Sequence, residues 1–259
     1  MRIVFNIVVA LALLAALPAL AAPDKDKKDQ KDTGAPPGSV GAGAMTLEQI
    51  TKELQYLTAQ KEGIVVNFIL PKGWEVVEEG IDAKTGKVRE DLNVYSLLSR
   101  RPVADPKDPT DFIFELDIYK HGLKEGAKAD PKTGVVPSEA DQFKEFLDVQ
   151  MSVNIKGRLK VTSKPADIVP RAYGPDNRPK TIFVPVFYET PTGADLYTFT
   201  SVAGDKVWQM KFLVSKGQTE NYGALIALML DNTFGMTDAE FQELLKNSAT
   251  STPKGEAPK

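Results

Sequence analysis

The sequence predicts an α/β (α+β) fold: an antiparallel β-sheet of about six to eight strands sandwiched between helices. Several segments are rich in β-branched and aromatic residues, and residues 111–121 alternate most clearly between apolar and polar side chains, which is typical of strands. Short turns join many of these segments, and such turns require antiparallel neighbours, because a parallel crossover needs a dozen or more residues. Apolar residues at helical spacing near both ends and once mid-chain predict helices that cover both faces of the sheet.

The first 21 residues have the pattern of an export signal. Arg2 gives a positive start, residues 3–17 are apolar apart from Asn6, and Ala19-Leu20-Ala21 is a small-x-small cleavage site. The apolar run, at about 15 residues, is shorter than the ~20 that a membrane-spanning helix needs. We therefore expect cleavage after Ala21, a periplasmic or secreted protein, and no integral membrane span after cleavage.

Composition divides the rest of the chain into three parts. Residues 22–44 are rich in Lys and Asp, then in Gly, Pro and Ala, which is typical of a disordered linker. Residues 45–247 are long enough for a single domain with its own core, and residues 248–259 are predicted to form a disordered tail. Because the chain has no cysteine, its core must be stable without disulfides. A bacterial lipid anchor, which requires a cysteine at the cleavage site, is also excluded. The formal charge of -3, which becomes one unit more negative when Arg2 is removed, argues against a nucleic-acid partner.

The first predicted element of the domain is a helix over residues 46–60. Thr46 and Gln49 form a capping box, and four apolar residues recur at helical spacing: Leu47, Ile50, Leu54 and Leu57. Gly63 is expected to end this helix. Residues 64–70 then predict a strand, Pro71-Lys72-Gly73 a tight break, and residues 74–79 a short return strand that forms the first hairpin.

The middle of the chain adds strands and a helix. Residues 92–100 and 111–121 predict strands, and in the second strand Phe112, Phe114, Leu116 and Ile118 share one face. Ser138 is a predicted cap for a helix over residues 139–151, whose apolar stripe consists of Phe143, Phe146, Leu147 and Met151.

The last third of the chain predicts four strands and two helices. The strands cover residues 157–169, 180–189, 194–202 and 206–214. Gly204-Asp205 fits a two-residue hairpin, and Pro185 indicates an edge strand or a bulge. A helix is predicted from the apolar face Tyr222, Leu225, Ile226, Met229 and Leu230, and a short helix follows Thr237, which has a capping box with Glu240.

Together these segments resemble the PsbP/Mog1-like superfamily. The resemblance lies in the Pro-x-Gly-Trp sequence at residues 71–74, the Phe-Lys-Glu-Phe-Leu of the central helix, and the hairpin "YTFTSVAGDKVWQMKFLV", which leads to a helix ending in "LMLDNTF". It covers roughly residues 57–234 and suggests a bacterial exported member. The resemblance implies an antiparallel sheet between helices and relatives that dock onto other proteins without catalysis. It implies no functional residue. Trp74 and Trp208 are expected to be structural.

Catalytic motifs are missing from the sequence. There is no cysteine, a single histidine, and no G-x-S-x-G, H-E-x-x-H or G-x-x-x-x-G-K-[ST] motif. We therefore predict a non-enzymatic protein without an organic cofactor.

One group of residues could nevertheless bind a divalent metal ion such as zinc or manganese. Alternation places Glu115, Asp117, Tyr119 and His121 on one side of a strand, so Glu115, Asp117 and His121 are candidate ligands if a neighbouring strand adds another. The alternative is an ordinary solvent-facing side, because successive side chains about 6.6 Å apart do not easily share one ion.

Two long loops supply candidate partner contacts. Lysines make residues 120–138 locally basic, and residues 170–180 add two arginines and a tyrosine. The candidate contact residues are Lys120, Lys124, Lys128, Lys132, Arg171, Tyr173 and Arg178. Loops on a rigid scaffold often carry binding sites, although simple solvated insertions would have the same composition.

These observations favour an exported binding or accessory protein that docks onto another protein or complex of the cell envelope. A carboxylate-dependent envelope hydrolase, with Glu115 or Asp117 as acid or base, is one alternative. A carrier of small apolar ligands, with a cavity between sheet and helices, is another.

Overall fold

The structure, a computed structural model of the chain, describes residues 53–79, 93–102, 111–124, 129, 131, 134–176 and 179–250. The predicted export signal, the linker, residues 46–52 of the predicted first helix and residues 251–259 lie outside the described residues. In chain order, the long elements are β1 (Leu54–Lys61), β2 (Ile64–Pro71), β3 (Glu75–Glu79), β4 (Val94–Arg100), β5 (Phe112–Gly122), α3 (Glu139–Lys156), β8 (Thr181–Glu189), β9 (Asp195–Ala203), β10 (Lys206–Val214), α4 (Thr219–Asp231), β11 (Phe234–Thr237) and α5 (Asp238–Thr250). The short elements are β6 (Lys160–Val161), η2 (Pro165–Asp167) and β7 (Arg171–Tyr173).

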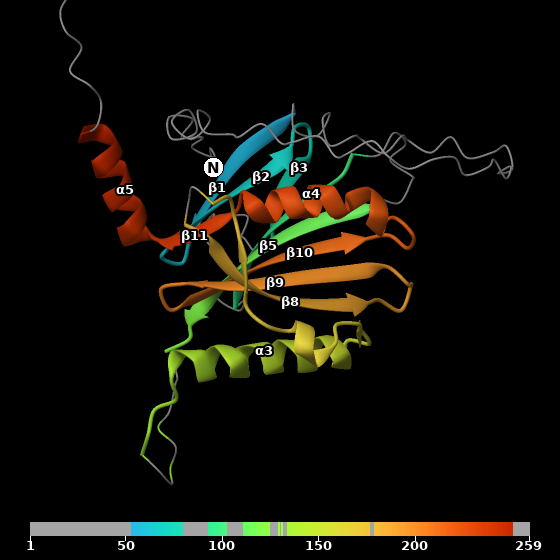
Figure 1. Ribbon diagram of the computed structural model, residues 1–259, viewed down its shortest axis with the longest axis horizontal. Helices are drawn as coiled ribbons and strands as arrows, with labels where there is room; N and C mark the ends of the chain where they lie inside the picture. Colours follow the sequence, from blue (N-terminus) through green and yellow to red (C-terminus); the bar gives the residue numbers. More distant parts are fainter. Residues whose placement is uncertain are drawn as a thin grey trace, which may run out of the picture.

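The elements form layers around a large central sheet (Figure 1). Eight strands follow the order β3-β4-β5-β10-β9-β8-β6, with β7 also beside β8, and β1, β2 and β11 form a second, three-stranded sheet. The small sheet and α4 cover one face of the large sheet, and α3 lies on the other. Every pairing between the described strands is antiparallel, so the predicted fold class is confirmed.

The predicted helix before Gly63 is wrong over its described part, which is strand β1. Glu62 and Gly63 both have positive φ angles, 52° and 84°, and join β1 to β2 as a two-residue hairpin. Ala59 is buried whereas its neighbours Thr58 and Gln60 are exposed, which is strand periodicity. Leu54 and Leu57 are three positions apart, which is helical spacing, and this spacing led to the incorrect prediction of a helix.

Trp74 is structural, as predicted, but it does not close a hairpin between β2 and β3. β3 pairs with β4 in the large sheet, whereas β2 belongs to the small sheet. The bend at Gly73, where φ is 81°, therefore carries the chain from one sheet to the other. Trp74 packs at the crossing point, with its ring centroid 5.3 Å from that of Phe112.

The core lies between the two sheets and α4. The four residues assigned to one face of β5 are all fully buried: Phe112, Phe114, Leu116 and Ile118. Phe68 of β2 contacts Phe114 at 5.7 Å between ring centroids, and Tyr222 of α4 contacts Phe112 at 4.6 Å. The predicted apolar face of α4 is buried as a whole, and Trp208 is completely buried.

The turns near the end of the sheet follow the sequence closely. Gly204, with φ of 61°, is the first central residue of the two-residue β9–β10 hairpin. Pro185 faces Phe199 of β9 on one side of β8. On the other side, the short strands β7 and β6 pair only with residues 181–183 and 188–189, so no described strand pairs with Pro185 there. β8 is therefore not an edge strand, since β6 and β7 lie beyond it, but Pro185 itself lies in a stretch of β8 that pairs with a described strand on one side only.

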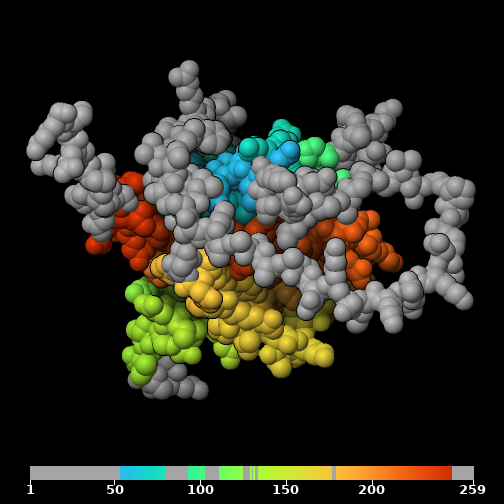
Figure 2. Space-filling view, turned by 45° about the horizontal axis from the view of Figure 1, so that its top comes forward, coloured from blue at the N-terminus to red at the C-terminus, as the bar shows by residue number. Residues whose placement is uncertain are grey.

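The helix caps lie where the sequence predicts them, whereas three other features of the structure differ from the prediction. Ser138 accepts a hydrogen bond from the Asp141 amide at the start of α3, and Thr237 and Glu240 form the predicted capping box of α5. The predicted strand over residues 157–169 is mostly irregular, because Pro165 begins a short 3₁₀ turn. Strand β11 was not predicted, and α5 reaches Thr250, inside the predicted tail. Figure 2 shows the connection from α3 to β8 (yellow) next to α3 (yellow-green).

Among the described residues, no helix combines the length and the apolar character that crossing a membrane requires.

Candidate functional site

The face of the large sheet that carries α3 is built from rows of side chains set by strand register. One row is polar and runs Ser96–Asp117–Gln209–Thr200 across β4, β5, β10 and β9. The next row runs Leu98–Glu115–Lys211–Thr198, and the third runs Arg100–Ile113–Leu213–Leu196. Polarity therefore changes from row to row. Glu115 and Lys211 lie in the middle row, between a polar row and a mostly apolar one.

Glu115, Asp117 and Lys211 form an ion-pair cluster in the middle of this face. Lys211 Nζ lies 3.3 Å from Glu115 Oε1 and makes a closer contact with Asp117 Oδ2. Ser96 Oγ donates to Asp117 Oδ1 at 2.5 Å. The Asp117 side chain is only 3% exposed, whereas those of Glu115 and Lys211 are 30% and 25% exposed. Two carboxylates thus share one ammonium group, and Glu115 has the longer contact.

Burial and charge act on this cluster in opposite directions. Burial raises the pKa of the Glu115 carboxyl to about 7, the charge of Asp117 adds to the rise, and Lys211 opposes it. Burial alone would lower the pKa of Lys211, but the carboxylates of Asp117 and Glu115 outweigh it and the pKa rises. Of the three groups in the cluster, Glu115 is therefore the one whose charge is least stabilised by an opposite charge.

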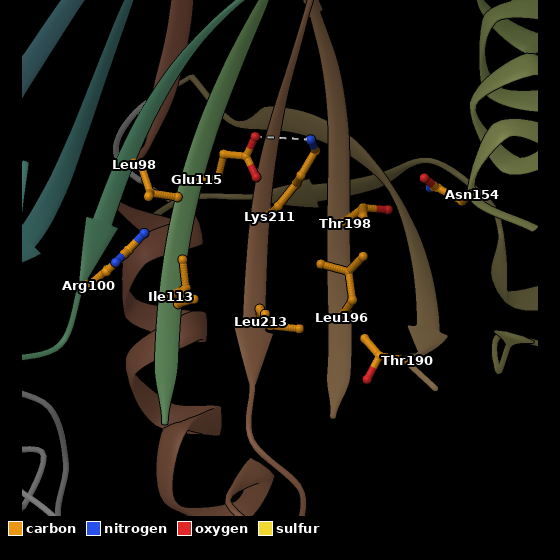
Figure 3. Close-up of a pocket in the computed structure, with 10 residues that line it drawn as sticks. All are labelled: Leu98, Arg100, Ile113, Glu115, Asn154, Thr190, Leu196, Thr198, Lys211 and Leu213. Carbon is orange, nitrogen blue, oxygen red and sulfur yellow. Dashed lines mark hydrogen bonds and ion pairs between the residues drawn. The ribbon is translucent and has the colours of Figure 1, made fainter. Parts of the chain in front are cut away.

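A hollow of about 370 Å³ opens beside this cluster (Figure 3). Its floor consists of the Glu115 and Arg100 rows, including the apolar side chains Leu98, Ile113, Leu196 and Leu213. Asn154 of α3 and Thr190 of the β8–β9 turn complete the lining. Arg100 is exposed and the four apolar side chains are half-buried, so α3 leaves this part of the sheet face accessible.

The structure brings together two of the three predicted metal ligands. Glu115 and Asp117 are adjacent, but the group between them is the Lys211 ammonium, which occupies the place where a cation would bind. His121 lies further along β5 and is exposed. In the described part of the chain, no three His, Asp or Glu side chains lie close enough to hold a metal ion.

The predicted partner-contact residues fall into two groups at one end of the large sheet. Lys120 and Lys124 lie at the end of β5, and Lys124 pairs with Glu139 at 2.6 Å. Arg171 and Tyr173 belong to strand β7 beside β8, and not to a loop as predicted. The strands β10 and β9 separate the groups.

Tyr173 is in fact a packing residue, with its ring 5.6 Å from that of Phe183. Lys128, Lys132 and Arg178 lie outside the described residues. A partner role for the remaining residues stays a prediction.

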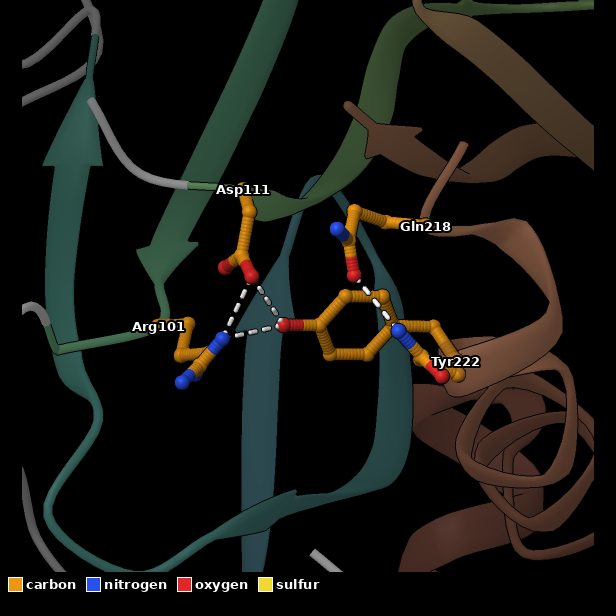
Figure 4. A network of polar contacts seen from close by, with 5 residues as sticks. Arg101, Asp111, Gln218 and Tyr222 are labelled. Carbon is orange, nitrogen blue, oxygen red and sulfur yellow. Dashed lines mark hydrogen bonds and ion pairs between the residues drawn. The ribbon is translucent and has the colours of Figure 1, made fainter. Parts of the chain in front are cut away.

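A second polar network fixes α4 to the sheet (Figure 4). Arg101 Nη1 lies 2.5 Å from Asp111 Oδ2 and donates to the Tyr222 hydroxyl at 2.5 Å, and that hydroxyl donates to Asp111 at 2.7 Å. Burial, first of all, raises the pKa of Tyr222 to about 12. The network anchors the start of α4 over Phe112, which is a structural role.

Lys211, Arg100 and the apolar lining of the hollow were missed by sequence reasoning. One feature of the sequence could have indicated Lys211, because it is a charged residue within the apolar run of β10. Its pairing with Glu115 depends on the β5–β10 register, which is not visible in either segment alone.

Among solved structures, the chain is similar to the solution structure of cyanobacterial PsbP (CyanoP) from Synechocystis sp. PCC 6803. The TM-score is 0.41 and the sequence identity 15%, and the match covers 77% of this chain and 99% of that chain. No family model and no curated protein matches. Membership of the PsbP/Mog1-like superfamily stays a prediction from the sequence.

Proposed function

We propose that this chain is an exported, non-enzymatic accessory protein that docks onto another protein of the cell envelope through the α3-bearing face of its large sheet. The observation that carries this proposal is the hollow beside α3. Four half-buried apolar side chains from β4, β5, β10 and β9 line it, next to a charged cluster. Accessible apolar surface beside charged groups is typical of protein-binding sites.

A hydrolase fits the site less well. One of its requirements is present, because burial raises the pKa of Glu115 to about 7 beside a hollow. A glycosidase also needs a second carboxyl group that reaches the scissile bond. Asp117 is 3% exposed and already bound by Lys211 and Ser96, so it lies out of a substrate's reach.

A carrier of small apolar ligands fits less well too. The volume of the hollow is within the range of small-ligand sites. However, the hollow lies on the outer face of the sheet, and three of its lining side chains, Arg100, Glu115 and Lys211, are charged. The interior between the sheets and α4 is packed with aromatic rings instead.

Site-specific photo-crosslinking in the native envelope tests the docking surface. A photoreactive phenylalanine analogue in place of Ile113, in the hollow, is expected to give a discrete crosslinked product with a second protein. The matched control is the same analogue in place of Tyr56, which is exposed on β1 in the small sheet on the other side of the molecule. Products from the Tyr56 position alone, or from neither position, would contradict the proposal.

Export is tested separately by N-terminal sequencing of the protein recovered from the envelope fraction. The pattern at residues 19–21 predicts a new terminus at Ala22. A protein that retains Met1 and stays in the cytoplasmic fraction would contradict this part of the proposal.

A further inference from the structure

The hollow has an unbalanced set of charges at its inner end. Lys211 makes its closer contact with Asp117, which Ser96 also satisfies, so the ammonium group and the buried carboxylate form a matched pair. Glu115 shares the same ammonium group at 3.3 Å and projects from the floor of the hollow (Figure 3). A carboxylate in this position is stabilised by a second cation delivered from the open side.

The apolar lining specifies what kind of cation fits. Ile113 and Leu213 lie one row away from Glu115 and Lys211, and Leu98 is the direct cross-strand neighbour of Glu115. A hydrated ion would leave these apolar side chains in contact with water. A lysine or arginine side chain has an apolar stem that packs on such residues while its charged end reaches the carboxylate.

The other charged lining residue does not supply this cation. Arg100 is exposed and faces Ile113, one row away from Glu115, and among the described residues Glu115 forms an ion pair with Lys211 but none with Arg100. Its cross-strand neighbour on β3 is Glu75, which is also exposed. The carboxylate directly across from Arg100 is therefore that of Glu75 on the rim, whereas Glu115 lines the hollow.

We propose that the hollow binds an extended segment of a partner protein in which a lysine or arginine side chain, flanked by apolar side chains, inserts next to Glu115. This inference rests on the proposed docking function and names the chemistry of the partner. In an extended segment, residues i, i+2 and i+4 face the same way. The fitting pattern is therefore a basic residue at the inner end of the hollow with an apolar residue two positions away on the side of Ile113 and Leu213, and the symmetric pattern apolar–x–basic–x–apolar offers it in either chain direction.

Short peptides test the proposal without knowledge of the partner. The probe is acetyl-Leu-Ser-Lys-Ser-Leu-amide, and three matched peptides replace the lysine by glutamine, the lysine by glutamate, or both leucines by serine. Binding to the full-length protein is followed by NMR of the methyl groups of Ile113, Leu196 and Leu213. The lysine peptide is expected to bind about five to ten times more tightly than the glutamine peptide. The glutamate and serine variants are expected to bind more weakly still.

Two protein variants locate the charge recognition. With Glu115→Gln, the preference for lysine over glutamine should fall below about twofold. Glu75→Gln removes the same charge at the rim and should keep the full preference. Methyl spectra of both variants check that the fold is intact. The glutamine peptide should bind to Glu115→Gln and to the wild-type protein with the same affinity, and it therefore reports on the apolar part of the site.

The pH dependence gives a further readout of the same contact. Because Glu115 ionises near neutral pH, the lysine preference of the wild-type protein should be larger at pH 8 than at pH 6. Equal preferences in wild type and Glu115→Gln, an equal loss with Glu75→Gln, or no methyl shift with any peptide at millimolar concentration would overturn the proposal.

The two proposals fail in different ways. Crosslinking at Ile113 combined with no lysine preference would leave the docking function standing and remove the basic segment. A lysine preference without crosslinking would show that the hollow binds basic segments but that no envelope protein docks there.

Discussion

Glu115 has an environment that differs strongly from that of a free side chain. Its carboxyl group is mostly buried beside Asp117, and the single ammonium group of Lys211 has to serve both. In the folded protein its pKa is about 7, against ~4.3 for an unperturbed glutamate. A carboxyl group in this environment weakens the fold when it is ionised, so its charge is open to stabilisation by a bound cationic group.

This pKa difference predicts how Glu115→Gln changes stability with pH. Between about pH 4.3 and pH 7 the folded protein holds a proton on Glu115 that the unfolded chain has released, so folding stability decreases as the pH rises through this range. Glutamine does not titrate. The variant should therefore gain about 1–3 kcal/mol in unfolding free energy relative to wild type on going from pH 5 to pH 8, measured by urea denaturation.

Glu240 provides a control of opposite sign. The backbone amide of Thr237 and then its hydroxyl lower the pKa of Glu240, so its contribution is present at neutral pH and is lost only in acid. Glu240→Gln should weaken the protein similarly at pH 5 and at pH 8. If Glu115→Gln behaves in the same way as Glu240→Gln, the carboxyl group of Glu115 is not perturbed as described.

At the scale of elements, the β1–β2 hairpin shows a local compromise. Its turn places Glu62 at a φ of 52°, which costs a residue with a side chain about 1–2 kcal/mol, although Gly63 beside it adopts its φ of 84° freely. Asparagine tolerates this conformation better and is favoured before glycine in such turns.

Glu62→Asn should therefore raise the free energy of unfolding by about 0.5–1 kcal/mol. Thermal or urea unfolding measures the change. Glu53→Asn removes the same charge just before β1, outside the turn, and should leave stability nearly unchanged. A loss of stability in Glu62→Asn would speak against the hairpin.

Strand β11 is held against the large sheet by a close contact. A Cβ atom on Gly235 would lie 2.6 Å from Nε1 of the buried Trp208. Because ring and strand are both fixed by packing, Gly235→Ala should cost about 1–3 kcal/mol. Gly223, an exposed residue of α4 with open space around it, is the matched control, and Gly223→Ala should stabilise the protein by about 0.5–1 kcal/mol. Equal effects of the two substitutions in urea denaturation would contradict this account of β11.

The elements also show where sequence reasoning succeeds. Strand β5, helix α4, the β9–β10 hairpin and the caps at Ser138 and Thr237 were predicted because each depends on a pattern within a few residues. Strand β1 was mistaken for a helix because Leu54 and Leu57 are three positions apart, which is helical spacing, although both pack against the core from a strand. Strand β11 has only four residues and owes its form to pairing with β2.

The candidate site was predicted only in part for the same reason. Glu115 and Asp117 could be placed on one side of a strand, but their partner Lys211 lies 94 residues or more away in sequence and meets them through register. The hollow combines residues of four strands, one turn and α3. Long-range pairing of this kind leaves no pattern in any single segment.

For the molecule as a whole, the two sheets share one core. Rings of β2, β5 and α4 are in contact, and Trp74 packs where the chain crosses from the small sheet to the large one. The two sheets should therefore unfold together.

In urea, tryptophan fluorescence and far-ultraviolet circular dichroism should report a single transition with the same midpoint. Phe68→Leu, at the contact between the sheets, should lower both midpoints equally. A first transition that removes only part of the circular dichroism signal and leaves the fluorescence of the buried tryptophans unchanged would show two separate cores.

The borders of the large sheet have a consequence for how this protein behaves at high concentration. On the β8 side, Pro185 has no amide hydrogen to donate at the place where no described strand is paired, and on the β3 side the exposed Glu75, Glu78 and Glu79 repel a second copy of the same strand. These two described stretches therefore disfavour the pairing of a further copy of the chain, by the missing amide hydrogen on one side and by repulsion between like charges on the other.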